Sequence, residues 1–319
     1  MRSLPAILVG AIFAGGCERV AEPHFDDGEA PPAPDEWTGP VADGGFGSRL
    51  AASGDRVWAG SPFAARVDEL LPAGAVGNSV TGASGSFFGS GLAVVGGRLA
   101  IGVPVRGEVL IDGAVVATLP GMGGVIAADG DRWVASTPTG WRSVDGAMGD
   151  LGRRPSALVW SGDEVLAGAA HGQTALWSGS SAIATPRVAP TDEQGFSLAV
   201  CPDDTGAAQV WSGAPGAGAG VIVPAGGASL GPGSDRFGAA IACGGDPGVL
   251  WVGAPAHDAH AGALYRVEGG EAVRVLTGAA GEELGAALIV SGGRVFVGAP
   301  GHQRGRGRVL ARPESSFAR

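Results

Sequence analysis

One short unit recurs along the chain and limits what it can fold into. The unit runs from Phe46 to Pro62 and reads FGSRLAASGDRVWAGSP. Seven copies start 32 to 47 residues apart. A period near 40 residues with alternating apolar residues is typical of one four-stranded blade of a β-propeller. The sequence therefore predicts an all-β, seven-bladed β-propeller of four-stranded blades. The copies begin at Phe46, Phe88, Met122, Arg154, Phe196, Phe237 and Leu284.

Each unit contains the signals of paired strands. In the second copy, residues 92–95 and 98–102 are apolar runs separated by Gly96-Gly97. A Gly-Gly pair supplies the positive φ angles that a two-residue hairpin needs. The last copy leaves little chain for a fourth strand after Ala311. We expect the segment 37–41 to supply that strand and to close the ring, which removes the open sheet edges.

The N-terminus has the features of an export signal. Arg2 precedes a short apolar run, residues 4–13, which is too short to span a bilayer. Small residues then lead to Cys17, so the segment resembles a bacterial lipoprotein signal. The resemblance implies that Cys17 is acylated and holds the protein on the lipid bilayer of the cell envelope, without saying which membrane. The alternative is an ordinary signal peptide cut nearby.

These features divide the chain into four parts. Residues 1–16 are the expected signal peptide, and residues 17–36 form an acidic, proline-rich tether that cannot bury enough apolar surface to fold alone. Residues 37–312 form the expected propeller, and residues 313–319 a C-terminal tail. The net charge of -10 argues against nucleic acid as a partner.

The repeats resemble the FG-GAP repeats of the integrin α-subunit propeller and of many bacterial surface proteins. The resemblance rests on the Phe-Gly start and the Gly-Ala-Pro end of the unit, and covers roughly residues 44–312. It implies an extracytoplasmic setting and a role in adhesion or protein recognition. That family often binds calcium in a D-x-D-x-D-G hairpin. Here the nearest candidate is Asp203-Asp204, which lacks the alternating acids. A solvated turn is the simpler interpretation.

Histidines could provide a different metal site. His257 and His260 follow the sixth Gly-Ala-Pro, His302 follows the seventh, and His171 has a comparable place in the fourth copy. Loops at one end of the ring could gather imidazoles for zinc or copper. No cysteine or spaced carboxylate completes a ligand set, so exposed loop histidines are the simpler interpretation. We expect no metal and no cofactor.

The sequence carries no motif of a catalytic site. No serine stands on a nucleophile elbow, which needs a G-x-S-x-G turn between a strand and a helix: Gly227-Ala228-Ser229-Leu230-Gly231 matches the letters, but the repeats have no helical periodicity. Glu282-Glu283 precede a repeat and are expected to be solvated rather than to form a glycosidase pair. We therefore expect that the protein is not an enzyme.

Large residues and cysteines complete the pattern. Trp58, Trp133, Trp211 and Trp251 lie near one repeat position, where Phe296 stands in the last copy, and are expected to pack between blades. Cys201 and Cys243 end the first strands of consecutive copies. An even pair in an exported protein suggests a disulfide, with buried thiols as the alternative.

Together these patterns favour a lipid-anchored, extracytoplasmic recognition or adhesion module for a protein or glycan partner. A structural envelope scaffold without a discrete ligand is the alternative. A propeller enzyme with an unrecognised site is the third possibility, because fold resemblance does not establish function.

Overall fold

A computed structural model describes residues 35–168, 176–178, 181–183, 193–216, 220–232 and 236–317, which belong to one compact unit spanning residues 33–318. The expected signal peptide, Cys17 and His171 lie outside the described residues. Among the described residues, no helix has the length and hydropathy required to cross a membrane.

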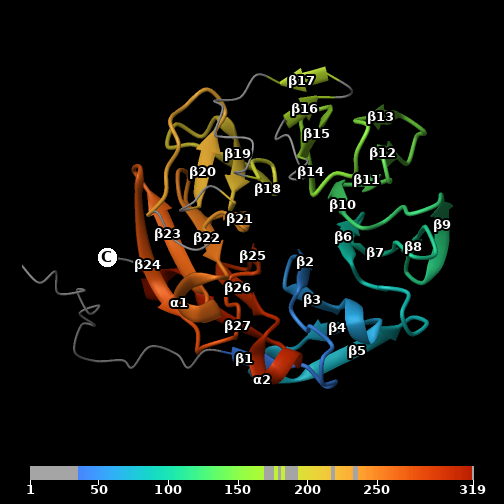
Figure 1. The fold of residues 1–319 in the computed structure, drawn as a ribbon, viewed down its shortest axis with the longest axis horizontal. Coiled ribbons are helices and arrows are strands. Elements are labelled where there is room, and N and C mark those ends of the chain that lie inside the picture. The colour runs from blue at the N-terminus through green and yellow to red at the C-terminus, as the bar shows by residue number, and fades with distance from the viewer. Residues whose placement is uncertain are drawn as a thin grey trace, which may run out of the picture. The chain divides into compact units, whose positions relative to one another are not determined.

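The strands form antiparallel sheets in which neighbouring strands follow one another in sequence, except that β1 pairs with β27 (Figure 1). The first hairpin of the second copy shows why. Gly96 and Gly97 have φ angles of 53° and 76° and join two strands in which Val95 pairs with Arg98. Glycine adopts such angles without a steric penalty.

Six sheets are four-stranded blades, and one of them takes its fourth strand from the N-terminal segment. Their strands are β2 (Arg49–Ser53), β3 (Arg56–Ser61), β4 (Arg66–Leu70) and β5 (Val76–Thr81); β6 (Gly91–Val95), β7 (Arg98–Val103), β8 (Glu108–Ile111) and β9 (Ala114–Thr118); β10 (Ile126–Asp129), β11 (Arg132–Ser136), β12 (Gly140–Ser143) and β13 (Met148–Asp150); β14 (Ala157–Ser161), β15 (Glu164–Gly168), β16 (Leu176–Ser178) and β17 (Ser181–Ile183); β21 (Ala240–Cys243), β22 (Leu250–Ala254), β23 (Ala263–Glu268) and β24 (Glu271–Thr277); and β25 (Ala287–Ser291), β26 (Arg294–Ala299), β27 (Arg308–Pro313) and β1 (Asp35–Thr38).

The prediction of seven four-stranded blades is wrong, because the structure has six. The remaining sheet has three strands in the described part of the chain: β18 (Ser197–Pro202), β19 (Ala208–Ala214) and β20 (Val221–Pro224). After β20, only Leu230 pairs with Ile222, as an isolated bridge with two 2.8 Å backbone hydrogen bonds. Residues 225–232 contain three glycines and Pro232, and such residues weaken strand pairing.

Short helical turns follow the second strands β3, β22 and β26, the third strand β4, and the strand β27. They are η1 (Pro62–Ala64), η2 (Pro72–Gly74), α1 (His257–His260), α2 (His302–Gly305) and η4 (Glu314–Phe317).

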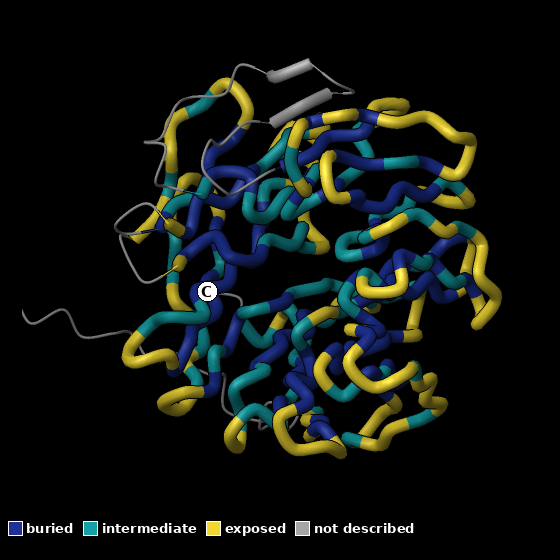
Figure 2. The backbone as a smooth tube through the Cα atoms, turned by 45° about the vertical axis from the view of Figure 1, so that its right-hand side comes forward, coloured by how far each residue is buried: buried dark blue, intermediate teal, exposed yellow. Residues whose placement is uncertain are grey.

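The first strands of the sheets make the inner ring (Figure 1). Each contacts the first strands of the two neighbouring sheets, in the order β2, β6, β10, β14, β18, β21, β25 and back to β2. The backbone is buried mainly along the strands and exposed mainly in the turns (Figure 2).

The N-terminal segment closes this ring. The closing strand was expected at residues 37–41 and lies at 35–38, where β1 pairs with β27. It therefore includes two residues assigned to the tether. Trp37 is buried and its Nε1 donates to the carbonyl oxygens of Leu71 (2.7 Å) and Ala75 (2.9 Å) in the first blade. The expected tail also packs on the blades, because Glu314 accepts a 2.7 Å hydrogen bond from Trp251 Nε1.

The core lies between adjacent sheets, as predicted for the large aromatic residues. Trp58 on β3 packs with Leu92 and Ile101 of the next blade. Trp133, Trp251 and Phe296 are also buried, and Trp211 is partly buried. Burying such side chains contributes about 1.5–3 kcal/mol each.

The glycines of the repeat are explained by close contact between neighbouring sheets. In each pair, one glycine lies on a second strand and the other lies just before the first strand of the next sheet; we call the latter the first-strand glycine. A Cβ added to the second-strand glycine would lie less than 3.0 Å from the carbonyl oxygen of the first-strand glycine. No ordinary side chain fits at that distance. The last pair joins the end of the ring to its beginning. The pairs are Gly60–Gly89, Gly102–Gly123, Gly168–Gly195, Gly213–Gly238, Gly253–Gly285 and Gly298–Gly47.

This contact also corrects the alignment of the fifth copy. Gly195 has φ 87° and its N–H bonds the carbonyl of Gly213, as Gly47 bonds Gly60. Gln194, and not Phe196, therefore takes the place of Phe46. Gln194 is buried and its amide donates to Ser212 Oγ at 3.2 Å. The sequence alignment missed Gln194 because it placed a phenylalanine at the start of this copy.

Candidate binding site at the mouth of the central cavity

A cavity of about 1270 Å³ lies where the first strands begin, and residues from every sheet line it. The lining comes from the starts of the first strands, the turns before them, and the loops after the second strands. We call its charged residues and its histidine, together with Phe63, Phe87, Val105 and Phe196, the mouth. They are Asp43, Arg49, Phe63, Phe87, Val105, Arg154, Phe196, Arg236, His260 and Glu283.

Five mouth residues adopt a backbone conformation that favours glycine: Asp43, Phe87, Arg236, His260 and Glu283. Phe87, Arg236 and Glu283 have φ angles of 54°, 62° and 56°, and each lies two positions before the glycine that precedes a first strand. The first blade has Gly45 at this place, with φ 65°. A left-handed conformation costs an ordinary residue about 1–2 kcal/mol. Strain of this kind concentrates at functional sites.

The first two blades make one side of the mouth apolar. Phe63 and Val105 are each 64% exposed and Phe87 is 41% exposed. The rings of Phe63 and Phe87 meet edge to face with centroids 5.7 Å apart. Exposed aromatic groups that are already packed against each other offer a rigid apolar surface.

The mouth carries more positive than negative charge, although the chain is acidic. Its lining has three arginines against two carboxylates, a formal balance of +1, whereas the whole chain has -10. Arg49 Nε donates to the carbonyl of Ser90 (2.9 Å) and its Nη1 to that of Ser48 (2.7 Å). The protein around this guanidinium lowers the pKa of Arg49 through desolvation, although part of the side chain meets solvent.

On the opposite side, the charges pair with one another. Arg236 lies 3.5 Å from Glu193 and over the ring of Phe196. His260 Nδ1 lies 3.7 Å from Glu283. Glu193 therefore offsets the charge of Arg236, and Glu283 has the imidazole of His260 beside it.

The cavity also contains four serines, and each donates to a backbone carbonyl. Ser48 bonds Gly45, Ser90 bonds Phe87, Ser156 bonds Gly195, and Ser197 bonds Gly238. These hydrogen bonds tie the four hydroxyls to backbone carbonyls. A nucleophilic serine needs a neighbouring base.

The structure places the predicted histidine candidates in separate contacts. His257 Nε2 lies 2.7 Å from Arg274 Nη1, His260 faces Glu283, and His302 Nδ1 lies 2.6 Å from Glu282 Oε1. Within the described ranges, no group of three His, Cys, Asp or Glu residues could hold a metal ion.

The candidate calcium pair also has another role. Asp203 Oδ1 accepts hydrogen bonds from Thr205 Oγ1 (2.6 Å) and from the backbone N–H groups of Thr205 and Ala207 (both 2.9 Å). The Thr205 hydroxyl, followed by the Ala207 N–H, lowers the pKa of Asp203. This carboxylate therefore stabilises its own turn, and Asp204 lies beside Gly248 in the next sheet.

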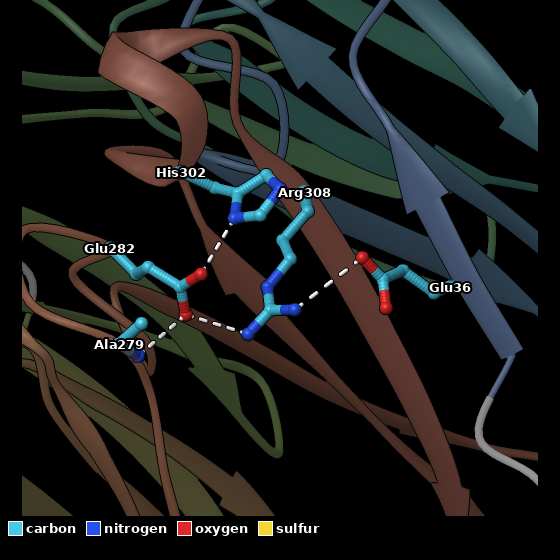
Figure 3. A network of polar contacts seen from close by, with 5 residues as sticks. All are labelled: Glu36, Ala279, Glu282, His302 and Arg308. Carbon is cyan, nitrogen blue, oxygen red and sulfur yellow. Dashed lines mark hydrogen bonds and ion pairs between the residues drawn. The ribbon is translucent and has the colours of Figure 1, made fainter.

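Glu282 departs from the expectation of a solvated acid. It is 7% exposed, and its carboxylate binds His302, the Ala279 N–H (2.8 Å) and Arg308 Nη2 (2.6 Å), while Arg308 also reaches Glu36 (Figure 3). Burial acts to raise the pKa of Glu282, but these hydrogen bonds and the charge of Arg308 outweigh it and lower the pKa. The cluster ties the last inter-blade turn to β27 and β1.

The two remaining cysteines lie on adjacent first strands. Cys201 is the second-last residue of β18, and Cys243 is the last residue of β21. Their sulfurs form a disulfide, with the two Cα atoms 5.3 Å apart. The ring arrangement of first strands explains why residues 42 positions apart meet.

Sequence reasoning singled out His260 and Glu283 for other roles and did not find the remaining mouth residues. The available signal was a bulky or charged residue where a repeat turn elsewhere has glycine: Phe87, Arg236 and Glu283 against Gly45. Arg49 and Arg154 gave no such signal, because they belong to different positions of the repeat.

Comparisons with known proteins show the fold but not a family. No protein-family model matches the chain, and no curated protein matches its sequence. A solved streptogramin B lyase is similar with a TM-score of 0.64 at 13% identity, covering 87% of this chain and 97% of that one. Virginiamycin B lyase from Staphylococcus aureus has the same score at 12% identity, covering 88% and 99%.

Neighbours of other kinds are equally similar. A chain of the mitotic checkpoint complex has a TM-score of 0.64 at 13% identity, covering 92% of this chain and 99% of its own. The computationally designed Ika8 protein scores 0.58 at 15% identity, covering 88% and 100%. At sequence identities of 12–15%, these similarities show only that the chain shares the fold of these proteins. The chain is a β-propeller.

Proposed function

We propose that the protein is a recognition module that binds a partner at the mouth of its central cavity and carries out no catalysis. The β-propeller fold supports a protein-interaction module in general. The observation that carries the proposal is the set of strained, exposed residues at the mouth. Phe87 and Arg236 adopt left-handed backbone conformations and line the same cavity as the exposed Phe63.

The strain argument favours binding over a purely structural role. Phe87 and Arg236 carry bulky side chains where glycine, as at Gly45, avoids the strain, and both side chains line the cavity. Glu193, strained at the same repeat position, pairs with Arg236. Exposed aromatic side chains beside arginine are the residue types enriched where binding energy concentrates in protein interfaces.

Cell attachment belongs to the same proposal. We propose export, acylation of Cys17 and attachment to the bacterial cell envelope, with the acidic segment before β1 as a tether. The supporting observation is the apolar run and small-residue box before Cys17. The repeat is proposed as a divergent FG-GAP unit, because its Phe-Gly and Gly-Ala-Pro glycines make the contacts between sheets. Adhesion to a protein or glycan is the role we propose for the anchored module.

Blocking the cavity tests the proposal. Gly124 lines it, and a Cβ there would meet Ser136 Oγ at 3.4 Å and Arg154 Nη1 at 3.8 Å, so Gly124→Trp adds bulk without a backbone clash. Val116→Trp on the outer strand β9, where the valine is 46% exposed, is the matched control.

Envelope extracts should supply a partner that wild type and Val116→Trp capture and that Gly124→Trp does not. Equal capture by all three folded proteins would move the binding surface away from the mouth. The absence of any partner enriched over a control propeller would remove the recognition role.

A further inference from the structure

We propose that the mouth takes an acidic peptide segment in which a carboxylate lies next to an aromatic or aliphatic side chain. The inference names the partner chemistry for the site of the proposed function and rests on that function. It depends on where the mouth is apolar, where its positive charge is unpaired, and which polar groups its lining lacks.

The apolar side offers a place for one large side chain. Phe63 and Phe87 pack edge to face, so their exposed ring surfaces are held in fixed positions, and Val105 extends the surface onto the next loop. A side chain bound against groups that are already ordered costs little conformational entropy in the protein.

Two arginines beside this surface lack a carboxylate partner. Across the described ranges, neither Arg49 nor Arg154 forms a salt bridge. Arg49 is oriented by the carbonyls of Ser48 and Ser90, which hold the guanidinium without neutralising it. A bound carboxylate would supply the missing counter-charge, and a hydrogen bond between two charged groups is stronger than one between neutral groups.

Arg49 and Arg154 arise from different sheets and line one cavity. Arg49 begins β2 in the first blade, and Arg154 lies in the turn before β14, where its Nη2 comes close to Gly121. Their separation in the ring places positive charge on two sides of the apolar surface. A segment with an acid on each side of its apolar residue matches that arrangement.

The acidic groups of the mouth do not cancel this charge. Glu283 faces His260, and Arg236 faces Glu193. Asp43 lies beside Gly305 at the end of α2: a Cβ added to Gly305 would lie 3.3 Å from Asp43 Oδ1. These groups belong to the closing part of the ring, whereas the exposed apolar side chains come from the first two blades.

The lining favours a peptide over a glycan. Its described residues include no asparagine, glutamine, tyrosine or tryptophan, and its serine hydroxyls are bonded to backbone carbonyls. Sugar hydroxyls need several such polar partners at fixed positions. A long nucleic acid would also meet the overall charge of -10.

A fluorescent, capped pentapeptide with a central phenylalanine, aspartate on both sides and terminal glycines is the probe. Its anisotropy on titration with the full chain is compared with that of three analogues. In the first, asparagine replaces aspartate; in the second, alanine replaces phenylalanine; in the third, lysine replaces aspartate. We expect the acidic aromatic probe to bind at least about tenfold tighter than each analogue, and its binding to weaken as salt is raised.

The variants locate the binding. Arg49→Gln, Arg154→Gln and Phe87→Ala should each weaken it about tenfold, and Arg49→Lys should retain most of it, because the charge remains. Arg98→Gln is the matched control, because Arg98 begins β7 at the hairpin, the end of the strands opposite the mouth. It should bind as wild type does. Unchanged melting temperatures show that the variants remain folded.

The outcomes separate this inference from the proposed function. Equal binding of the acidic and asparagine peptides, preference for the lysine peptide, or binding of an oligosaccharide panel in place of peptides overturns the acidic-peptide assignment. If Gly124→Trp still abolishes capture of a natural partner in that case, the recognition role stands without it. If none of the peptides binds and Gly124→Trp captures as wild type does, both fall.

Discussion

The glycine pairs between sheets allow a quantitative test of the ring. In Gly253→Ala, the new Cβ would lie 2.8 Å from the carbonyl carbon of Gly285 and 3.0 Å from its Cα, with the carbonyl oxygen closer still. Ordinary contact begins at 3.4 Å. The two backbones must therefore move apart by about 0.6 Å at least, and both belong to sheets held by hydrogen bonds.

We expect Gly253→Ala to lower the free energy of unfolding by about 3 kcal/mol, the upper end for overpacking, because backbone atoms rather than a flexible side chain are in the way. Unfolding entropy near 2.1 cal/mol/K per residue, applied to the unit of residues 33–318, converts this loss into a fall in Tm of roughly 5 °C.

Thermal and denaturant unfolding, followed by both far-UV circular dichroism and tryptophan fluorescence, measure the effect, and coincident transitions check that unfolding is all-or-none. Gly97→Asn is the control, because Gly97 has φ 76° with no atom near its Cβ position, and asparagine tolerates that conformation. A Gly253→Ala protein within about 0.5 kcal/mol of wild type would refute the close-contact explanation.

The repeat itself supplies a natural comparison. In the blade from β10 to β13, Ser136 stands where the others have this glycine, and its carbonyl accepts the N–H of Gly123. The next turn carries Pro155 in place of the first-strand glycine. Both glycines of this pair are therefore replaced together. This is expected if each glycine is needed only because its partner in the next sheet lies so close.

Three further predictions concern single groups. Glu282→Gln should cost about 2 kcal/mol at neutral pH. Because the pKa of Glu282 is lowered in the folded protein, its contribution is present above pH 4.5 and lost as pH falls through the folded pKa; the Tm of the variant should therefore depend less on pH in that acid range. Removing the disulfide with Cys201→Ala and Cys243→Ala should lower stability by about 4 kcal/mol for a 42-residue separation, and wild type treated with a thiol-alkylating reagent under denaturing, non-reducing conditions should show no mass increase at these cysteines. Cys17→Ser should abolish labelling by a fatty-acid analogue and membrane retention; unchanged labelling would exclude acylation at this residue.

The local architecture followed from the sequence. Gly-Gly and Gly-Asp turns between short apolar runs predicted the first hairpin of each unit, and the recurrence of Trp58, Trp133 and Trp251 predicted the packing between blades. These features depend on residues close together in the chain, or on one position seen many times, so the pattern is visible without coordinates.

Features that differ from one repeat to the next became visible only in the tertiary structure. The sheet of β18 to β20 has three strands, because its last segment is rich in glycine and ends in proline, and Gln194 occupies a place where a phenylalanine was sought. Glu282 looked like a surface acid until His302 and Arg308 were brought to it from 20 and 26 residues away.

The mouth depended on the ring most of all. Arg49 and Phe63 belong to the first blade, Phe87 to the second and Arg154 to the fourth, and they occupy different positions of the repeat. Periodicity determines what each unit buries, but only the curvature of the assembled ring brings non-repeating residues around one cavity. The sequence by itself determined the hairpins and the packing between blades, but not the number of four-stranded blades; the site exists because those sheets close into a circle.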